Sequence, residues 1–172
     1  MKFLLDQSIE ILERTPSMLT DLLSGLSDDW ICNNEGKDTW SPFDVVGHLI
    51  HGEKTDWIIR TKTILFEGKK SFIPFDRFAQ FEASKGKSMT DLLTEFELLR
   101  NQNILELKSF ELSDSDLMKT GVHPEFGEVT LRQLLACWVT HDLGHITQIT
   151  RVLAKNYAEE VGPWRKYRKV VS

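Results

Sequence analysis

The sequence has few cysteines, no long apolar run and no block of charge of one sign. Its 172 residues include two cysteines, Cys32 and Cys137, which lie too far apart to suggest the disulfide framework of a small secreted domain. No apolar run approaches the roughly 20 residues that a membrane-spanning helix needs. Near the start, Asp6 interrupts the apolar residues too early for a signal peptide. We therefore expect a cytoplasmic protein without a membrane partner.

The charge pattern argues against a nucleic-acid partner. The formal net charge is −5 at pH 7, and acidic and basic residues are interspersed along the chain. The one basic run, residues 165–169, lies near the C-terminus, where such a run is typical of a solvated tail. Nucleic-acid-binding domains usually carry a basic patch or stripe, so we expect no nucleic acid among the partners.

Composition and length predict one domain. Hydrophobic residues make up 41% of the chain, which is enough to form a core at this length. The chain contains no internal repeat and no low-complexity segment that would mark a linker. The domain is expected to span residues 1–172.

Apolar residues recur at helical spacing in four segments, and almost no segment alternates as a strand would. The first segment spans about residues 3–26 and contains Pro16. Proline lacks the N–H that bonds within a helix, so we expect a kink or a break near Thr15.

The other three segments each begin with a serine or threonine that can cap a helix. We expect the second helix from Ser41 to about Phe66, the third from Ser88 onward and the fourth from Thr130 to about Lys155. At each start, the residue three positions later can complete a capping box.

Two stretches lie between these helices. Residues 68–87 mix Gly, Lys, Pro and Phe and predict a long crossover with a short helix at about 76–84. Residues 120–129 predict a loop or a small hairpin. The sequence therefore predicts an all-α fold, a four-helix bundle with one long crossover. Periodicity does not define the connectivity of the bundle.

Two histidines on the fourth helix suggest a metal site. His141 and His145 are four residues apart, so they lie on one helical face, and the neighbouring apolar residues turn that face inward. Two imidazoles on one face can share a divalent metal if a third ligand comes from elsewhere. Buried histidines bonded to a carbonyl or carboxylate remain the alternative.

His48 on the second helix is a candidate third ligand. It shares the inward side of that helix, and His51 lies about 60° away around the helix axis. A di-iron bundle needs Glu-x-x-His pairs, and no glutamate here has a histidine three residues later. Asp142 follows His141 as the catalytic glutamate follows the first histidine of a metalloprotease helix, but its shorter side chain makes a peptidase unfavoured.

Several motifs together resemble the DinB/YfiT-like superfamily. The stretch from Thr39 to Leu49 resembles its second-helix motif. The segments from Thr130 to Leu135 and from His141 to Ile149 resemble its fourth-helix motif. An early Thr15-Pro16 and a late Gly-Pro-Trp at 162–164 extend the resemblance over nearly the whole chain.

The resemblance implies a four-helix bundle with up-down-down-up connectivity that often forms homodimers. It also implies a divalent metal, often nickel or zinc, on the histidines that correspond here to His48, His141 and His145. Members of known activity include S-transferases that use low-molecular-weight thiols such as bacillithiol, and a mycothiol-dependent isomerase. Other members are known only as metal-dependent hydrolases.

Side chains near the histidines each have two interpretations. Asp44 can orient His48 or cap the second helix, and its spacing from Ser41 favours capping. Gln148 can bond to a ligand or substrate, or it can be a buried structural amide. Cys137 can line a pocket or fill the core. Among the remaining polar residues, we expect solvent-facing side chains at Glu53 and Asp56 and a loop position for His123.

Together, these patterns favour a metalloenzyme that activates a nucleophile and acts on a small-molecule substrate. Asp44, Asp142 and Gln148 are candidate supporting residues. A thiolate is a strong nucleophile that needs little help near neutral pH, so thiol transfer is narrowly favoured over hydrolysis. A non-catalytic metal-binding protein and a bundle without metal remain the alternatives.

Overall fold

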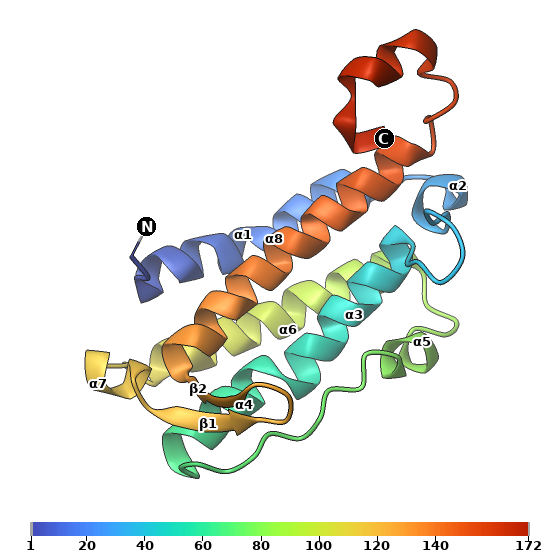
Figure 1. Cartoon of the computed structure of the whole chain (residues 1–172). Helices are drawn as coiled ribbons and strands as arrows, with labels where there is room; N and C mark the ends of the chain where they lie inside the picture. Colours follow the sequence, from blue (N-terminus) through green and yellow to red (C-terminus); the bar gives the residue numbers. More distant parts are fainter. Residues whose placement is uncertain (1, 172) are drawn as a thin grey trace.

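Four long helices carry the four apolar segments of the sequence (Figure 1). The computed structural model describes residues 2–171. The long elements are α1 (Leu5–Leu23), α3 (Pro42–Thr55) continued by α4 (Trp57–Phe66), α6 (Met89–Ser109) and α8 (Leu131–Lys155).

Short elements connect the long ones. They are α2 (Asp28–Ile31), α5 (Ala79–Ala83), α7 (Asp114–Leu117), an antiparallel hairpin of β1 (Thr120–His123) and β2 (Gly127–Thr130), and the 3₁₀ helices η1 (Gly162–Tyr167) and η2 (Lys169–Val171). The hairpin packs against α4 and α8, so it covers one end of the bundle (Figure 1).

The bundle has up-down-down-up connectivity. Helices α1 and α8 run in one direction, whereas α3 with α4, and α6, run in the other (Figure 1). Because α3 and α6 are parallel neighbours, the chain must return along the bundle between them, and residues 67–88 with α5 make this crossover. The predicted four-helix bundle with one long crossover is confirmed.

The predicted helix starts are also confirmed. Reciprocal capping boxes begin α3 at Ser41 and Asp44, α6 at Ser88 and Asp91, and α8 at Thr130 and Gln133. At the first of these, Asp44 Oδ2 accepts hydrogen bonds from the Ser41 backbone N at 2.9 Å and from Ser41 Oγ at 2.7 Å. The carboxylate of Asp44 therefore caps α3, as its spacing favoured.

Pro16 does not break α1, which runs unbroken from Leu5 to Leu23. Proline cannot donate to the carbonyl four residues earlier, which belongs to Leu12. That oxygen instead accepts a hydrogen bond from Arg100 Nη1 at 2.9 Å. A buried guanidinium thus replaces the missing N–H, and this is why the expected break is absent.

The second predicted helix ends at Phe66 as expected, but Asp56 interrupts it. The backbone of Asp56 leaves the usual helical geometry, with φ −120° and ψ −77°, and α4 begins at Trp57. The N–H of Asp56 still bonds to the Gly52 oxygen, and the N–H of Arg60 bonds to the Asp56 oxygen. The interruption is therefore confined to one residue.

The core consists of two apolar halves. One half contains Leu12, Trp57, Trp138 and Ile104, and the other contains Leu19, Leu49, Phe96 and Ile149. Polar side chains at mid-length of the long helices lie between these halves, as described below. No helix within residues 2–171 combines the length and apolar character required to cross a membrane.

Candidate metal site

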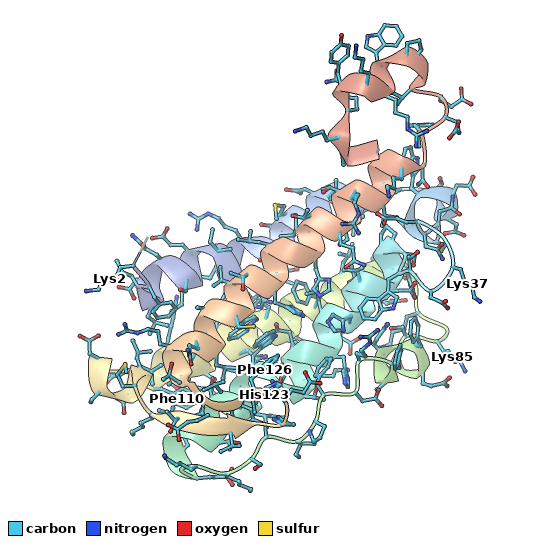
Figure 2. All side chains as sticks on the ribbon, viewed as in Figure 1. Lys2, Lys37, Lys85, Phe110, His123 and Phe126 are labelled. Carbon is cyan, nitrogen blue, oxygen red and sulfur yellow. The ribbon has the colours of Figure 1, made fainter. Side chains whose placement is uncertain are left out.

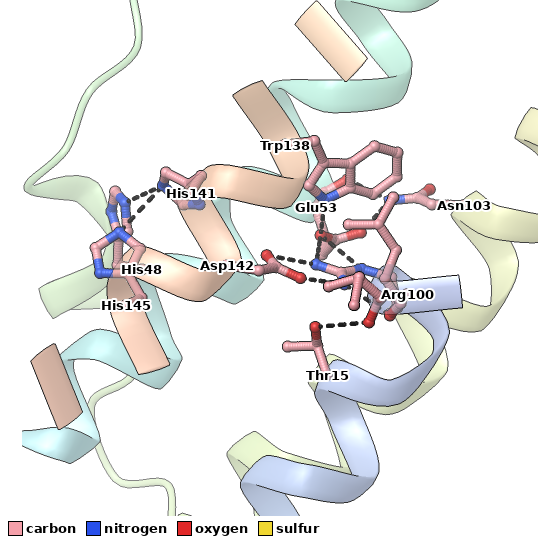
Figure 3. Close-up of polar contacts among 11 residues, drawn as sticks. Thr15, His48, Glu53, Arg100, Asn103, Trp138, His141, Asp142 and His145 are labelled. Carbon is pink, nitrogen blue, oxygen red and sulfur yellow. Dashed lines mark hydrogen bonds and ion pairs between the residues drawn. The ribbon is translucent and has the colours of Figure 1, made fainter. Parts of the chain in front are cut away.

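Three histidines from two helices meet beside the crossover. His48 projects from α3, and His141 and His145 project from successive turns of α8 (Figure 3). The Nε2 atom of His141 lies 3.1 Å from Nε2 of His48 and 3.1 Å from Nε2 of His145. The structure thus brings together the three histidines that were predicted to form a site, and each offers a nitrogen within 4.8 Å of the others.

Burial holds these imidazoles in the neutral form, which is the form that binds a metal. Burial, and then the charge of the neighbouring His145, lower the pKa of His48 to about 3. Burial and then His145 lower the pKa of His141 to about 2. The pKa of His145 is also lowered by burial. All three rings can therefore offer nitrogen lone pairs at neutral pH.

Neighbouring side chains contact two of the three rings, those of His145 and His48. The Oε1 atom of Gln148 lies 2.9 Å from Nδ1 of His145, so an N–H at Nδ1 leaves the Nε2 lone pair directed at the other histidines. The indole of Trp40 lies 4.8 Å from the ring of His48 and is nearly parallel to the ring of His145. The sequence left open whether Gln148 bonds to a ligand or substrate or is a structural amide, and in the structure it contacts His145.

The donor set fits a divalent ion. Bonds of about 2.0–2.1 Å from imidazole nitrogens to one ion place those nitrogens roughly 3–3.4 Å apart. The two separations from Nε2 of His141, 3.1 Å each, agree with this spacing. Imidazole ligands suit zinc and nickel among the divalent metals. Within residues 2–171, no other group of three or more His, Cys, Asp or Glu side chains meets in this way.

The histidines line the wall of an open cavity of about 750 Å³. A volume of this size is typical of small-molecule sites. The cavity extends from the histidines to the hairpin, and His123 and Phe126 border it at the hairpin end (Figure 2). Its walls are mostly aromatic or apolar, with Trp40, Trp57 and Phe75 nearest the histidines.

Asp142 does not lie in this cavity. Its carboxylate is fully buried on the opposite side of α8 and accepts hydrogen bonds from Arg100 Nη1 at 2.6 Å and Nη2 at 3.0 Å (Figure 3). Asp44 caps α3 and is likewise not part of the cavity wall. Neither carboxylate is placed to take a proton from a nucleophile at the histidines. By contrast, Cys137 lines the cavity.

The expectation that Glu53 faces solvent is wrong. Glu53 is 4% exposed, and its Oε1 accepts hydrogen bonds from Arg100 Nη2 at 2.7 Å and from Trp138 Nε1 at 3.2 Å. Asn103 donates to Oε2 at 2.8 Å. The carboxylate points inward because a buried guanidinium on another helix compensates its charge. Asp142 and Glu53 together surround Arg100 (Figure 3).

The sequence carried a signal for this cluster. Arg100 lies four residues after Phe96 and four before Ile104, both in the core, so the helical period places its side chain inward. A charged residue at such a position needs a buried partner of opposite charge. The identity of that partner could not be read from the sequence, because Glu53 and Asp142 lie on other helices.

Asp56 was also expected to face solvent, and it is 8% exposed. Its carboxylate pairs with Nε of Arg60, and both residues line the cavity. His123 was expected in a loop, but it is the last residue of β1 and lines the same cavity. These residues lie some distance along the chain from the histidines, and only the packing of α4 and the hairpin places them at the same cavity.

Fold and site together define a class: an up-down-down-up helical bundle whose three inward histidines could hold a metal at an open pocket. A family model of the DinB superfamily matches residues 11–149. The chain belongs to the DinB superfamily.

Relatives and solved structures agree with this assignment. A Bacillus cereus (strain 03BB102) protein named "Putative metal-dependent hydrolase" is 28% identical over 148 residues, which cover 86% of this chain and 84% of that protein. YfiT from Bacillus subtilis, described as a probable metal-dependent hydrolase with an unusual four-helix bundle topology, has a TM-score of 0.75 and 26% identity, covering 85% of this chain and 83% of its own. The four-helix bundle protein TT2238 is 18% identical with a TM-score of 0.57, and it supports the fold alone.

Proposed function

We propose that this protein is a divalent-metal-dependent enzyme that acts on a small molecule, with His48, His141 and His145 as the metal ligands. The observation that carries the proposal is the convergence of three neutral imidazoles on the wall of an open cavity. Metal-dependent hydrolase names among the relatives support it. Nickel and zinc are the proposed metals because both accept imidazole ligands.

The protein side chains have distinct roles in this proposal. The three Nε2 atoms bind the metal, Gln148 fixes the ring of His145, and Trp40 packs against His48. A bound divalent metal supplies positive charge that lowers the pKa of a water or thiol beside it. The aromatic walls lower the polarity of the same space, which strengthens that electrostatic effect.

Transfer of a low-molecular-weight thiol to an electrophilic carbon is the preferred reaction. The two carboxylates nearest the histidines in sequence, Asp44 and Asp142, are committed to a helix cap and to Arg100. Water activation therefore has no carboxylate base from either residue. A thiol with an ordinary pKa of about 8.5 needs less help to form its nucleophilic anion.

Hydrolysis is the second candidate, and the names of the relatives favour it. A site of this kind could use a hydroxide at neutral pH without a protein base, because a metal can lower the pKa of water to about 7. The two reactions differ in whether thiol consumption or water addition accompanies turnover.

Metal analysis tests the first part of the proposal. The protein is purified without chelators and reconstituted with nickel or zinc, and its metal content is measured by mass spectrometry. We expect one divalent ion per chain, and we expect His48→Ala, His141→Ala and His145→Ala to lose most of it while retaining helical circular dichroism. His51→Ala is the matched control, because His51 lies on the same helix but outside the cluster. A wild type without stoichiometric metal would disprove the proposal.

A turnover assay tests the second part. Thiol consumption with an electrophilic acceptor is followed spectrophotometrically for metal-loaded wild type and for His145→Ala. Faster consumption by the wild type supports thiol transfer. Equal rates with both proteins and buffer, together with ester or amide turnover by the wild type alone, would favour hydrolysis instead.

A further inference from the structure

The two most buried arginines differ in how many of their hydrogen-bond donors have a partner in the protein. Arg100 donates from Nε, Nη1 and Nη2 to Glu53, Asp142 and the Leu12 carbonyl. Arg60, on α4, is 8% exposed but pairs only through Nε, with Asp56. A guanidinium carries five N–H donors, so the donors on Nη1 and Nη2 of Arg60 lack a protein partner among the residues that the structure describes.

These unused donors are accessible from the cavity. Arg60 lines the cavity. None of its nitrogens is both buried from solvent and without a hydrogen-bond partner, whereas Nε of Arg132 is. Its Cζ lies 5.1 Å from the ring centroid of Phe72, which supports one face of the guanidinium. Asp56 fixes the Nε edge. Arg60 thus presents a fixed pair of donor groups to whatever occupies the cavity.

The arginine lies at the hairpin side of the histidines. Burial and then the positive charge of Arg60 lower the pKa of His123, so the guanidinium lies close enough to this hairpin residue to affect its charge. Cys137, one helical turn before His141, also feels the charges of both Asp56 and Arg60. One turn of α-helix rises about 5.4 Å. Arg60 and the three histidines line the same cavity of about 750 Å³, so one small ligand can contact both.

We propose that Arg60 binds the carboxylate of the substrate at the hairpin end of the cavity, while the reacting atom of that substrate lies at the three histidines. The position of the reacting atom rests on the proposed function, whereas the role of Arg60 does not. The substrate class is a small monocarboxylate with an apolar body.

Shape and charge both favour a carboxylate. The planar fork of a guanidinium matches a carboxylate with two parallel hydrogen bonds. Asp56 neutralises the positive charge of Arg60, so the pair suits a monoanion better than a doubly charged phosphate group. The walls between the two ends, including Phe72, Val129 and Leu134, suit an apolar body.

Calorimetric titration with matched probes tests this assignment. 4-Phenylbutyrate, its primary amide and 3-phenylpropylphosphonate are titrated into the full-length protein, both as purified and after chelator treatment. We expect the carboxylate to bind about tenfold more tightly than the amide in both preparations, because hydrogen bonds between charged groups are stronger. Arg60→Gln should abolish this preference, and Arg60→Lys should retain only part of it because lysine lacks the fork. Arg14→Gln, which removes an exposed arginine from α1, should leave it unchanged.

Protection of Cys137 from N-ethylmaleimide gives a second readout in a Cys32→Ser background, because Cys137 borders the cavity. The carboxylate should slow alkylation most in the wild-type cavity, less after Arg60→Lys and not at all after Arg60→Gln. If Arg60→Gln does not fold, the lysine variant decides the outcome.

The outcomes separate this inference from the proposed function. A carboxylate preference that persists in protein without metal supports Arg60 even if the metal proposal fails. A preference lost on chelation or in His141→Ala assigns the carboxylate to the metal and overturns the inference alone. Arg77 is another arginine that lines the cavity. Loss of the preference in Arg77→Gln but not in Arg60→Gln would overturn the inference, as would tighter binding of the phosphonate or no binding of the carboxylate at millimolar concentration.

Discussion

Arg100 connects the four long helices from a side chain with no solvent exposure. It projects from α6 and bonds to α1 through the Leu12 carbonyl, to α3 through Glu53 and to α8 through Asp142. Burial raises the pKa of Glu53, and the charge of Arg100 opposes that rise. Both buried carboxylates therefore depend on the one positive charge of Arg100.

Replacement of Arg100 should therefore be costly. Arg100→Met leaves the carboxylates of Glu53 and Asp142 buried without a cation, and we expect a loss of about 3–5 kcal/mol in the free energy of unfolding. Urea denaturation followed by circular dichroism measures it. Lys108→Met is the control, because the ion pair of Lys108 with Glu13 is about half exposed and should contribute less than about 1 kcal/mol. A similar small loss for both variants would show that the buried cluster is not needed for stability.

Gln148 offers a test of histidine positioning under the proposed function. Gln148→Leu removes the side chain that bonds to Nδ1 of His145, and we expect metal affinity to fall by about 10–100-fold without loss of helix content. Competition with a chromogenic chelator measures the affinity. Gln102→Leu, an exposed position on α6, controls for the substitution itself. Unchanged affinity in Gln148→Leu would mean that packing alone orients His145.

Asp56 should make stability depend on pH. Burial raises its pKa from 3.8 to about 6, although Arg60 opposes the rise. The native state then binds the proton more tightly than the unfolded chain. The stabilising contribution is present below about pH 4 and is lost as the pH rises through about 6, with a total on the order of 2–3 kcal/mol.

Asp56→Asn isolates this effect, because asparagine does not titrate. We expect the free energy of unfolding of the wild type, relative to that of Asp56→Asn, to decrease between pH 4 and pH 7. Parallel urea titrations of the two proteins across this range provide the measurement. A difference that stays constant with pH would show that Asp56 titrates normally.

At the scale of elements, two glycines differ in the space around them. One lies in the closely packed hairpin and the other lies on α8. A Cβ added at Gly121 in β1 would lie 2.6 Å from Cε1 of Phe72 and 2.9 Å from Cγ1 of Ile64 on α4. A Cβ at Gly144 in α8 would meet nothing within 4 Å. The first glycine permits close approach of the hairpin, whereas the second does not serve packing within this chain.

The two glycines should therefore respond to alanine in opposite directions. Gly121→Ala should destabilise the protein by about 1–3 kcal/mol, because the hairpin must move away from α4. Gly144→Ala should stabilise it by about 0.5–1 kcal/mol, because alanine is the better helix former. Thermal and urea denaturation of both variants give the comparison. Stabilisation by Gly121→Ala would contradict the observed packing of the hairpin.

At the scale of the whole molecule, a second copy could cover large aromatic side chains that are exposed on the surface. Trp57 is not available for this, because it is 4% exposed and stacks on Trp138 at 5.6 Å. Trp30 packs edge-on against Tyr157. Trp164 in η1 remains 68% exposed. The exposed indole of Trp164 and the family resemblance are therefore the two reasons to expect association.

We still expect a homodimer at micromolar concentration. Sedimentation velocity over a range of concentrations measures the assembly, and Trp164→Ser should weaken it if the exposed indole lies in the interface. Lys166→Ser, a change of an exposed polar residue in the same 3₁₀ helix, is the control. Sedimentation of the wild type as a monomer throughout this range would refute the dimer.

Much of the fold could be predicted from local sequence, because helix periodicity and capping depend on residues three or four positions apart. Ser88 with Asp91 and Thr130 with Gln133 define two helix starts at this range. The spacing of His141 and His145 places both rings on one face for the same reason. The same period places His48 on the inward side of the second helix, and the family resemblance implies all three histidines as ligands. The observed geometry brings all three together.

Only the tertiary structure decided which distant groups compensate one another. Pro16 predicted a kink or a break in α1 because its local hydrogen bond is lost. The helix is unbroken, and Arg100, 88 residues from Leu12, supplies a donor from another helix. Glu53 and Asp56 were expected to face solvent because they lie off the inward stripe of the second helix. Their partners depend on the packing of helices, which no local pattern encodes. The same packing turned Asp142 away from the histidines and left two donor groups of Arg60 open to the cavity.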